Sequence, residues 1–249
     1  MSAFSPANTK LRKLSINSFM RSYLKNGRKV YSFDLLSGFS CPMALLCLAK
    51  AIVSEHGRRI QDGKHQRFRC FSASQEVAYP STYRKRKRNF DAMRGFDNVE
   101  EAVQFILSHL PHDAGVVRIH VSGDFFNWIY FQAWCIVARD NPSILFYAYT
   151  KSLDFLLRGI DEGIIPDNLN ITASRGGRLD HMIDEHGLKE AVVCFSKAEA
   201  KAKGLPIDKD DSHAAHPRYA GKSFALLIHG QQPAGSEAAA AVKELRKSA

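Results

Sequence analysis

From residue 116 onward the chain alternates short apolar stretches with amphipathic ones, and this alternation limits the possible folds more than any other feature. Apolar stretches with a period of two predict strands, and the longer segments between them have the pattern of helices. Six strands separated by helices predict an α/β protein with a parallel sheet and right-handed crossovers. Strands are expected at 29–37, 116–121, 144–150, 168–174, 191–196 and 223–230. Helices are expected at 127–139, 152–159, 178–186, 197–204 and 236–247, and the segment 41–57 is expected to start as a loop and become an apolar helix.

Two architectures fit this order, a partial (β/α)6-type barrel and a curved, mostly parallel sheet with flanking helices. We expect one α/β domain over residues 1–249, because its length requires no division. A basic, helical insertion is expected at about 58–112, with a break at Pro80 and a second helix at 98–110. In both architectures, ligands bind at the carboxyl ends of the strands.

The charge balance points to a polyanionic partner. The chain has 35 Lys and Arg against 25 Asp and Glu, a net charge of +10, which favours nucleic acid. No apolar run reaches the ~18 residues that a membrane span needs, and the N-terminus has no apolar signal region. We therefore expect a cytoplasmic protein that has no membrane partner.

The stretch VRIHVSGDFF at 117–126 places an acid where a strand should end. Gly123 permits a sharp turn, and Asp124 then faces the ligand-binding edge of the sheet unless it caps the next helix. Asn127 could supply that cap instead. We predict a catalytic role for Asp124. His120 and Lys151 lie at neighbouring strand ends and are predicted to be catalytic as well. Arg175 and Gly176, with Gly177, could bind a phosphate or carboxylate on their backbone amides or form an ordinary turn.

Three of the five cysteines follow the first predicted strand. Cys41 and Cys47 are spaced C-x5-C, and Cys70 comes after a long gap. Converging thiolates could hold an iron–sulfur cluster or zinc, although Cys47 could equally be a buried helix residue. Cys135 and Cys194 lie in apolar surroundings and are expected in the core.

Two polar stretches are the remaining candidates. DDSHAAHPRY at 210–219 could bind a metal, but we favour an ordinary surface loop there. The basic run YRKRKRNF at 83–90 is either a solvated face or a phosphate-contacting patch, and the overall charge favours the patch. The predicted nucleic-acid-binding residues are Arg84, Lys85, Arg86, Lys87 and Arg88, with DNA favoured over RNA.

The chain as a whole resembles the phage "gene product 88" family. The stretches that carry the resemblance are SCPMALLC, RCFSASQE, RIHVSGDFFNWIYFQAW, FYAYTKS and FALLIHGQQPAGSEAA, and they span most of the sequence. The resemblance implies a phage or prophage setting, with the host cytoplasm as the location, rather than a particular reaction.

A second, local resemblance is to radical S-adenosylmethionine (SAM) enzymes, in which a cysteine cluster follows strand one and a Gly-Gly-Glu-like turn ends strand two. It implies a [4Fe–4S] cluster on Cys41, Cys47 and Cys70, with Gly123 and Asp124 near the methionyl group of SAM. That family spaces its cysteines C-x3-C-x2-C, whereas here the third lies far downstream.

A third resemblance is to guanine transglycosylases, which carry Asp-Ser-Gly-x-Phe after a strand. Ser122, Gly123 and Phe125 match this motif, and they are the ligand-binding residues that it implies. Asp124 would take the place of the leading acid, and Asp180 could be a second carboxylate.

Taken together, the residues and resemblances predict a nucleic-acid-modifying enzyme, with exchange of a DNA guanine for a 7-deazaguanine as the first reading. The alternatives are a radical SAM-like iron–sulfur enzyme and a nucleic-acid-binding protein without catalysis. The cofactor is open between none and a [4Fe–4S] cluster with SAM.

Overall fold

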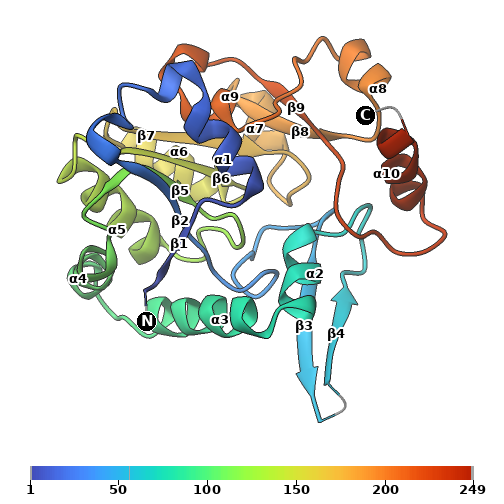
Figure 1. Cartoon of the computed structure of the whole chain (residues 1–249), viewed down its shortest axis with the longest axis horizontal. Helices are drawn as coiled ribbons and strands as arrows, with labels where there is room; N and C mark the ends of the chain where they lie inside the picture. Colours follow the sequence, from blue (N-terminus) through green and yellow to red (C-terminus); the bar gives the residue numbers. More distant parts are fainter. Residues whose placement is uncertain (1, 56, 248–249) are drawn as a thin grey trace.

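The computed structural model describes residues 2–55 and 57–247, and its centre is a seven-stranded sheet (Figure 1). The spatial order is β1-β2-β5-β6-β7-β8-β9, with β1 antiparallel to β2 and every later pairing parallel. The predicted α/β fold with a mostly parallel sheet and flanking helices is therefore confirmed. The strands are β1 (Phe4–Pro6), β2 (Lys29–Phe33), β5 (Ala114–Ile119), β6 (Leu145–Thr150), β7 (Leu169–Ser174), β8 (Glu190–Cys194) and β9 (Phe224–Leu227).

The six parallel strands follow one another in space as they do along the chain. The sheet is thus wound in one direction, as in a barrel, and not outward from a central strand. Among the described residues no ladder joins β9 to β1, so the sheet is open there. Because the strands run parallel, their carboxyl ends form one edge, where the loops after β2, β5, β6 and β7 meet.

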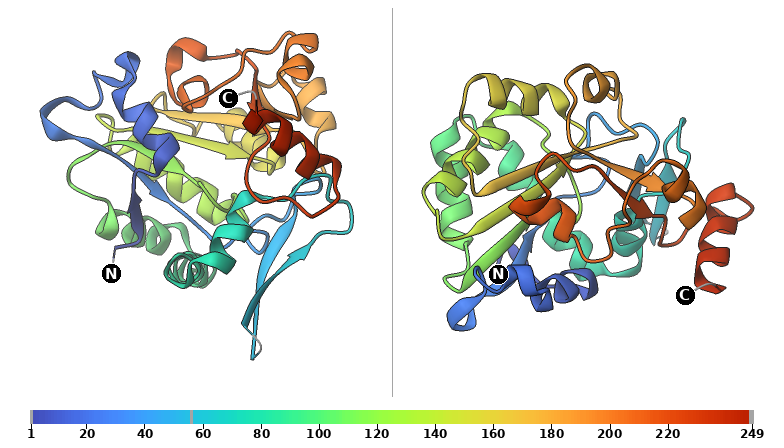
Figure 2. Two further views of the ribbon diagram at one scale, coloured as in Figure 1. Left: turned by 45° about the vertical axis from the view of Figure 1, so that its right-hand side comes forward. Right: turned by 90° about the horizontal axis from the view of Figure 1, so that it is seen from above.

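Helices cover both faces of the sheet (Figure 2). One face packs on α4 and α5 through a core that includes Phe33, Trp134 and Phe146. The other packs on α1 and α9 through Leu14 and Tyr147, among others. The helices are α1 (Thr9–Ile16), α2 (Phe71–Ala78), α3 (Pro80–Arg94), α4 (Val99–His109), α5 (Trp128–Arg139), α6 (Leu153–Asp161), α7 (His181–Glu185), α8 (Lys197–Ala202), α9 (Ser212–Ala215) and α10 (Glu237–Lys247).

The predicted helix at 41–57 is wrong. Residues 41–48 form a loop, and β3 (Ala49–Ser54) pairs with β4 (Gly57–Asp62) in an antiparallel hairpin that projects from the molecule (Figure 1). Ala49 and Ala51 are buried while Lys50 and Ile52 are partly exposed, which is the period of a strand. The predicted helical insertion at 58–112 therefore contains β4 before its three helices α2, α3 and α4.

Helix boundaries follow the predicted capping and breaking signals. Pro80 occupies the first turn of α3, where its missing N–H costs nothing. Asn98 and Asn127 accept hydrogen bonds from the first turns of α4 and α5, so Asn127 is the cap of α5. In the part of the chain that is described, no helix is both long and apolar enough to cross a bilayer.

Candidate functional site

The loop after β2 lies across the carboxyl edge of the sheet and is fastened to the end of β7. The carbonyl oxygen of Gly176 accepts from the N–H groups of Leu45 (3.2 Å) and Leu46 (2.9 Å). The N–H of Arg178 donates to the carbonyl of Met43 at 2.9 Å. These backbone bonds hold the loop that carries Cys41 and Cys47 over the strand ends.

Cys70 lies beside Cys47, although 22 residues separate them in sequence. Its N–H donates to the carbonyl of Cys47 at 3.2 Å, and it is the N-cap of α2. The side chain of Gln232, in the loop after β9, accepts from the N–H of Arg69 (2.7 Å) and donates to its carbonyl (3.2 Å). Arg69 and Cys70 are thus fixed by hydrogen bonds to the loop after β9 and to the loop after β2.

The five cysteines fall into two classes by exposure. Cys41, Cys47 and Cys70 are half-buried free thiols, whereas Cys135 and Cys194 are buried within α5 and β8. The predicted core placement of the last two is what the structure shows. The first three, hereafter the cysteine trio, keep access to solvent at the edge where parallel sheets bind ligands.

The cysteine trio, Asp124 and Lys151 interact electrostatically. Burial raises the pKa of the Cys41 thiol well above its usual range, and the charges of Asp124 and Cys70 raise it further. Burial also raises the pKa of Cys47 to about 11, while the ammonium of Lys151 acts in the opposite direction. The charges that act on these two thiols therefore belong to Asp124, Lys151 and the other cysteines of the trio. Bound metal would have to displace the thiol protons.

The site does not have the form of a single-ion site. Within residues 2–55 and 57–247, no three His, Cys, Asp or Glu side chains are grouped so that they could hold one metal ion. A cubane cluster makes a different demand, because each cysteine binds a different iron and the sulfurs stand further apart than around one ion. Three cysteine thiols are the kind of donor set that such a cluster takes, and here all three are half-buried.

Asp124 joins the ends of β5 and β6. Its Oδ1 accepts from the N–H of Phe125 (2.8 Å) and the hydroxyl of Thr150 (2.6 Å), and its Oδ2 accepts from the N–H of Lys151 (2.8 Å). It is 4% exposed, and burial raises its pKa to about 6 despite these donors. The acid at the end of this strand thus orders two neighbouring strand ends.

Lys151, Arg175, Gly176 and Asp180 are satisfied by the chain itself. Lys151 Nζ donates to the carbonyl (2.7 Å) and hydroxyl (2.8 Å) of Ser174 and to the carbonyl of Arg175 (3.0 Å). Asp180 accepts from the N–H groups of Gly176 and Gly177, both at 2.8 Å. Those two amides are therefore not open to an anionic ligand. Arg175 is paired with Asp184 and Glu190.

His120 and Phe125 belong to the core. Phe125 is fully buried, and its ring lies 4.9 Å from that of His120. His120 is 3% exposed with φ +70°, and its Nε2 lies 2.9 Å from the hydroxyl of Tyr130. Burial, with help from Arg118, lowers the pKa of His120 to about 3. His120 is thus buried in the core and is not open to a ligand.

Ser122 and Gly123 connect the strand end to its surroundings. The Ser122 hydroxyl donates to Glu76 at 3.1 Å. Gly123 has φ +98°, and a Cβ added there would lie 2.7 Å from both Leu35 Cβ and Ser40 Oγ. Glycine at this position lets the turn approach the loop that carries Cys41.

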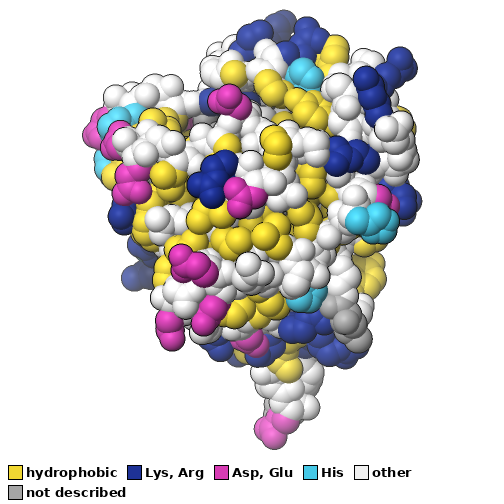
Figure 3. Space-filling model, turned by 90° about the vertical axis from the view of Figure 1, so that its left-hand side faces the viewer, with side chains coloured by type: hydrophobic (Ala, Val, Ile, Leu, Met, Phe, Trp, Pro, Cys, Tyr) yellow, Lys and Arg dark blue, Asp and Glu magenta, His cyan; other side chains and the backbone are white. Residues whose placement is uncertain are grey.

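The basic run on α3 is distributed around the helix. Arg86 is 3% exposed and forms a buried pair with Glu76 at 3.1 Å, so it cannot reach a phosphate. Lys85 donates to the carbonyl of Phe4, and Arg88 to that of Ser2. Arg84 and Lys87 are the exposed members, and Lys87 pairs with Asp91 along the helix. Figure 3 shows Lys and Arg side chains along the lower edge of the molecule, where α3 lies in Figure 1.

Two buried charge clusters were missed by sequence reasoning. Glu76, fully buried, accepts from the N–H (3.0 Å) and hydroxyl (2.6 Å) of Ser37 and so joins α2 to the loop after β2. Asp211, also fully buried, pairs with Lys10 and Arg118, so the stretch 210–219 is not a simple surface loop. No local pattern announces either cluster, because their partners lie far away in sequence.

Comparison with known proteins assigns the family. The family model "Gene product 88" matches residues 2–246. The chain belongs to the Gene product 88 family. A curated relative, the "Gene 88 protein" of Mycobacterium phage L5, is 56% identical over a stretch that covers 34% of this chain and 36% of the relative. The match thus spans about a third of each protein. No solved structure shows significant similarity to the chain.

Proposed function

We propose that this protein is an iron–sulfur enzyme that modifies nucleic acid, with Cys41, Cys47 and Cys70 as the ligands of a [4Fe–4S] cluster. The observation that carries the proposal is the cysteine trio itself. Two segments far apart in sequence bring three half-buried thiols to the carboxyl edge of the sheet, while the other two cysteines are buried. Three protein ligands would leave the fourth iron open to another molecule, and the cluster would supply one electron there.

Hydrogen bonds within the chain fix the two segments that carry the cysteine trio. The bonds from Leu45 and Leu46 to Gly176 fix the loop of Cys41 and Cys47, and Gln232 fixes the segment before Cys70. Lys151 places a positive charge in the same neighbourhood, and its three acceptors determine where its ammonium group lies. A cation there favours anionic thiolates and an anionic cluster.

SAM as the partner of the cluster is supported by resemblance and by the one-directional order of the six parallel strands. The residues that the resemblance places near SAM, Gly123 and Asp124, have structural partners of their own. They do not form an empty subsite, so we derive no step through SAM. Nucleic acid as the substrate is supported by the net charge of +10, and the curated phage relative suits a role in phage DNA or RNA.

Exchange of a DNA guanine is the second candidate. Its favourable observation is Asp124, a strand-end carboxyl whose pKa burial raises to about 6. A nucleophilic carboxylate needs a free oxygen aimed at the sugar, and Asp124 accepts three hydrogen bonds from the chain. Asp180, the second carboxylate of that mechanism, is occupied by two backbone amides. The geometry therefore supports the cluster better.

The experiment is iron and labile sulfide analysis, with a visible spectrum, on protein purified and reconstituted without oxygen. We expect about four irons and four sulfides per chain. Cys41→Ala, Cys47→Ala and Cys70→Ala should each lose most of the iron, whereas the control variants Cys135→Ala and Cys194→Ala should keep it. Iron that survives in the three site variants, or a wild-type protein without iron, would refute the proposal.

Mass spectrometry of nucleosides from DNA and RNA incubated with the protein separates the remaining functions. A modified base that requires the cluster supports the proposal. A modified base made by iron-free protein, and lost in Asp124→Asn, would establish base exchange instead. Binding without any new nucleoside would leave a nucleic-acid-binding protein.

A further inference from the structure

The β3–β4 hairpin is the most prominent projection of the molecule (Figures 1 and 2). Each strand has six residues, which corresponds to a ribbon about 20 Å long. Its strands pair only with each other in the described sheet topology, so the ribbon adds nothing to the main sheet. A two-stranded ribbon of this size is seldom stable unless one face is covered. Here α2 packs against one face, and the loop at Gly38 and Phe39 contacts the other face near Lys50.

The pairing register separates the two faces of the hairpin. Ala51, Arg58 and their cross-strand partners face α2, since the Nε of Arg58 donates to the carbonyl of Val77 at 3.1 Å. The opposite face carries three cross-strand pairs: Lys50 with Gln61, Ile52 with Arg59 and, next to the turn, Ser54 with Gly57. The first two of these pairs are hereafter the outer face of the hairpin.

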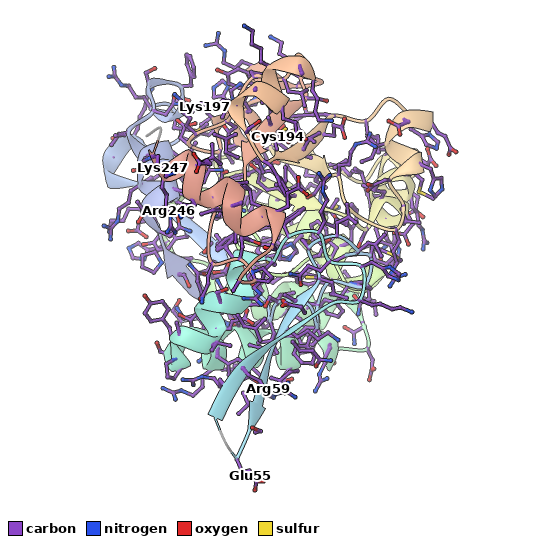
Figure 4. All side chains as sticks on the ribbon, turned by 90° about the vertical axis from the view of Figure 1, so that its right-hand side faces the viewer. Glu55, Arg59, Cys194, Lys197, Arg246 and Lys247 are labelled. Atoms are coloured by element: carbon purple, nitrogen blue, oxygen red, sulfur yellow. The ribbon has the colours of Figure 1, made fainter. Side chains whose placement is uncertain are left out.

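The outer face presents basic, amide and apolar side chains to solvent. Arg59 and Gln61 are exposed, and Lys50 and Ile52 are partly exposed. Residues 49–69 contain six Lys or Arg and two Asp or Glu, so the hairpin and its base carry a local surplus of positive charge. Figure 4 shows Arg59 on the ribbon and Glu55 at its far end. The ribbon is thus a cationic projection that carries hydrogen-bonding side chains.

We propose that the outer face of the β3–β4 hairpin binds the major groove of double-stranded DNA. The major groove of B-form DNA is about 12 Å wide and admits a two-stranded ribbon, whose strands lie about 4.8 Å apart. Arg and Lys pair with guanine there, Gln pairs with adenine, and an apolar side chain contacts the thymine methyl group. The four outer-face residues supply all three kinds of contact. A-form RNA has too narrow a major groove for such a ribbon.

The hairpin also lies next to the candidate site. The ammonium of Lys50 lies 4.8 Å from the centre of the Phe39 ring, and Phe39 is 40% exposed on the loop that carries Cys41. DNA held on the outer face would therefore lie beside the loop of the cysteine trio. This inference names the substrate class of the proposed enzyme but stands on the hairpin alone, so each can fail without the other.

The experiment measures binding of the full chain to a mixed-sequence DNA duplex by fluorescence anisotropy, at several salt concentrations. The same measurement is made with an RNA duplex and a single DNA strand of that sequence. The variant is Arg59→Glu, and the matched control is Arg246→Glu, an exposed arginine on α10 far from the hairpin (Figure 4). Both substitutions are exposed, and thermal unfolding verifies that both variants fold.

We expect wild type to prefer the DNA duplex. Arg59→Glu should weaken this binding by at least tenfold, because one lost arginine–base contact alone is worth about 5- to 150-fold. Arg246→Glu should weaken it less than twofold. Equal losses in the two variants, or tighter binding to RNA or single-stranded DNA, would overturn the proposal. The iron content of each variant is measured in parallel. An unchanged iron content in Arg59→Glu would show that a loss of DNA binding comes from the hairpin surface and not from loss of the cluster.

Discussion

Gly123→Ala tests whether the turn after β5 positions the loop of the cysteine trio. An alanine at φ +98° is strained by about 1–2 kcal/mol. Its Cβ would also lie 2.7 Å from Leu35 Cβ and Ser40 Oγ, contacts too short for any real side chain. Relieving such overpacking costs about 1–3 kcal/mol. The free energy of unfolding should therefore fall by about 2–5 kcal/mol.

The matched control is Gly163→Ala. Gly163 has φ +62°, and nothing lies within 4 Å of a Cβ added there, so only the backbone strain applies. Its free energy of unfolding should fall by about 1–2 kcal/mol. Urea unfolding of both variants measures the difference, provided that the slopes agree.

The two outcomes have distinct meanings. If Gly123→Ala costs more than its control, the excess measures the close approach of the turn to the loop. Ser40 is next to Cys41 in sequence, so the iron content of reconstituted protein should fall as well. A loss of stability equal to that of Gly163→Ala, with full iron content, would refute the reasoning.

Two further predictions concern buried titratable side chains. Arg86→Ala should lower the free energy of unfolding, measured in urea, by about 3–5 kcal/mol, because it leaves the buried Glu76 carboxyl without its ion-pair partner. Arg84→Ala, on the exposed side of the same helix, should change it by less than about 0.5 kcal/mol, and equal effects of the two substitutions would contradict the pairing. Burial lowers the pKa of His120 to about 3 in the folded protein, against 6.5 when unfolded. The free energy of unfolding is therefore unaffected by His120 above pH 6.5, and it falls by about 2 kcal/mol at pH 5 because the unfolded state binds the proton more readily. His120→Asn should remove that pH dependence from unfolding curves, and an unchanged curve would show that His120 does not titrate as described.

The sequence predicted the parallel part of the sheet well, because its signals are local. Apolar alternation marked all six parallel strands, and Asn98 and Asn127 marked the starts of two helices. The prediction failed at β3, since the apolar stretch ALLCLAKAIV fits a buried helix as well as a strand. The three-residue strand β1 is too short to show any period.

The candidate site was predictable only in part. The rule that ligands bind at strand ends predicted Cys41 and Asp124 at the same edge, and the charge of Asp124 does raise the pKa of the Cys41 thiol. It could not show that Asp124 and Arg175 are already satisfied, since their partners come from other elements. The pairing of Arg86 with Glu76 is hidden for the same reason, and it removes one cation from the predicted patch.

The wide spacing of the cysteines is explained by the hairpin that separates them. The N–H of Gly63 donates to the carbonyl of Leu48 at 2.8 Å, so the chain returns to its starting point after β4. The N–H of Phe68 then donates to the carbonyl of Leu46 at 3.1 Å, and Cys70 arrives beside Cys47. In space the third cysteine is thus next to Cys47.

This geometry predicts that the protein needs the hairpin to bind DNA but not to bind the cluster. Replacement of residues 50–61 by an Asn-Gly turn should keep Ala49 next to Asp62, because that dipeptide favours a tight hairpin turn. We expect the shortened protein to bind iron like wild type and to lose most of its affinity for the DNA duplex. Loss of iron in a folded protein would show that the hairpin does more than return the chain. Retained DNA affinity would mean that the duplex binds elsewhere.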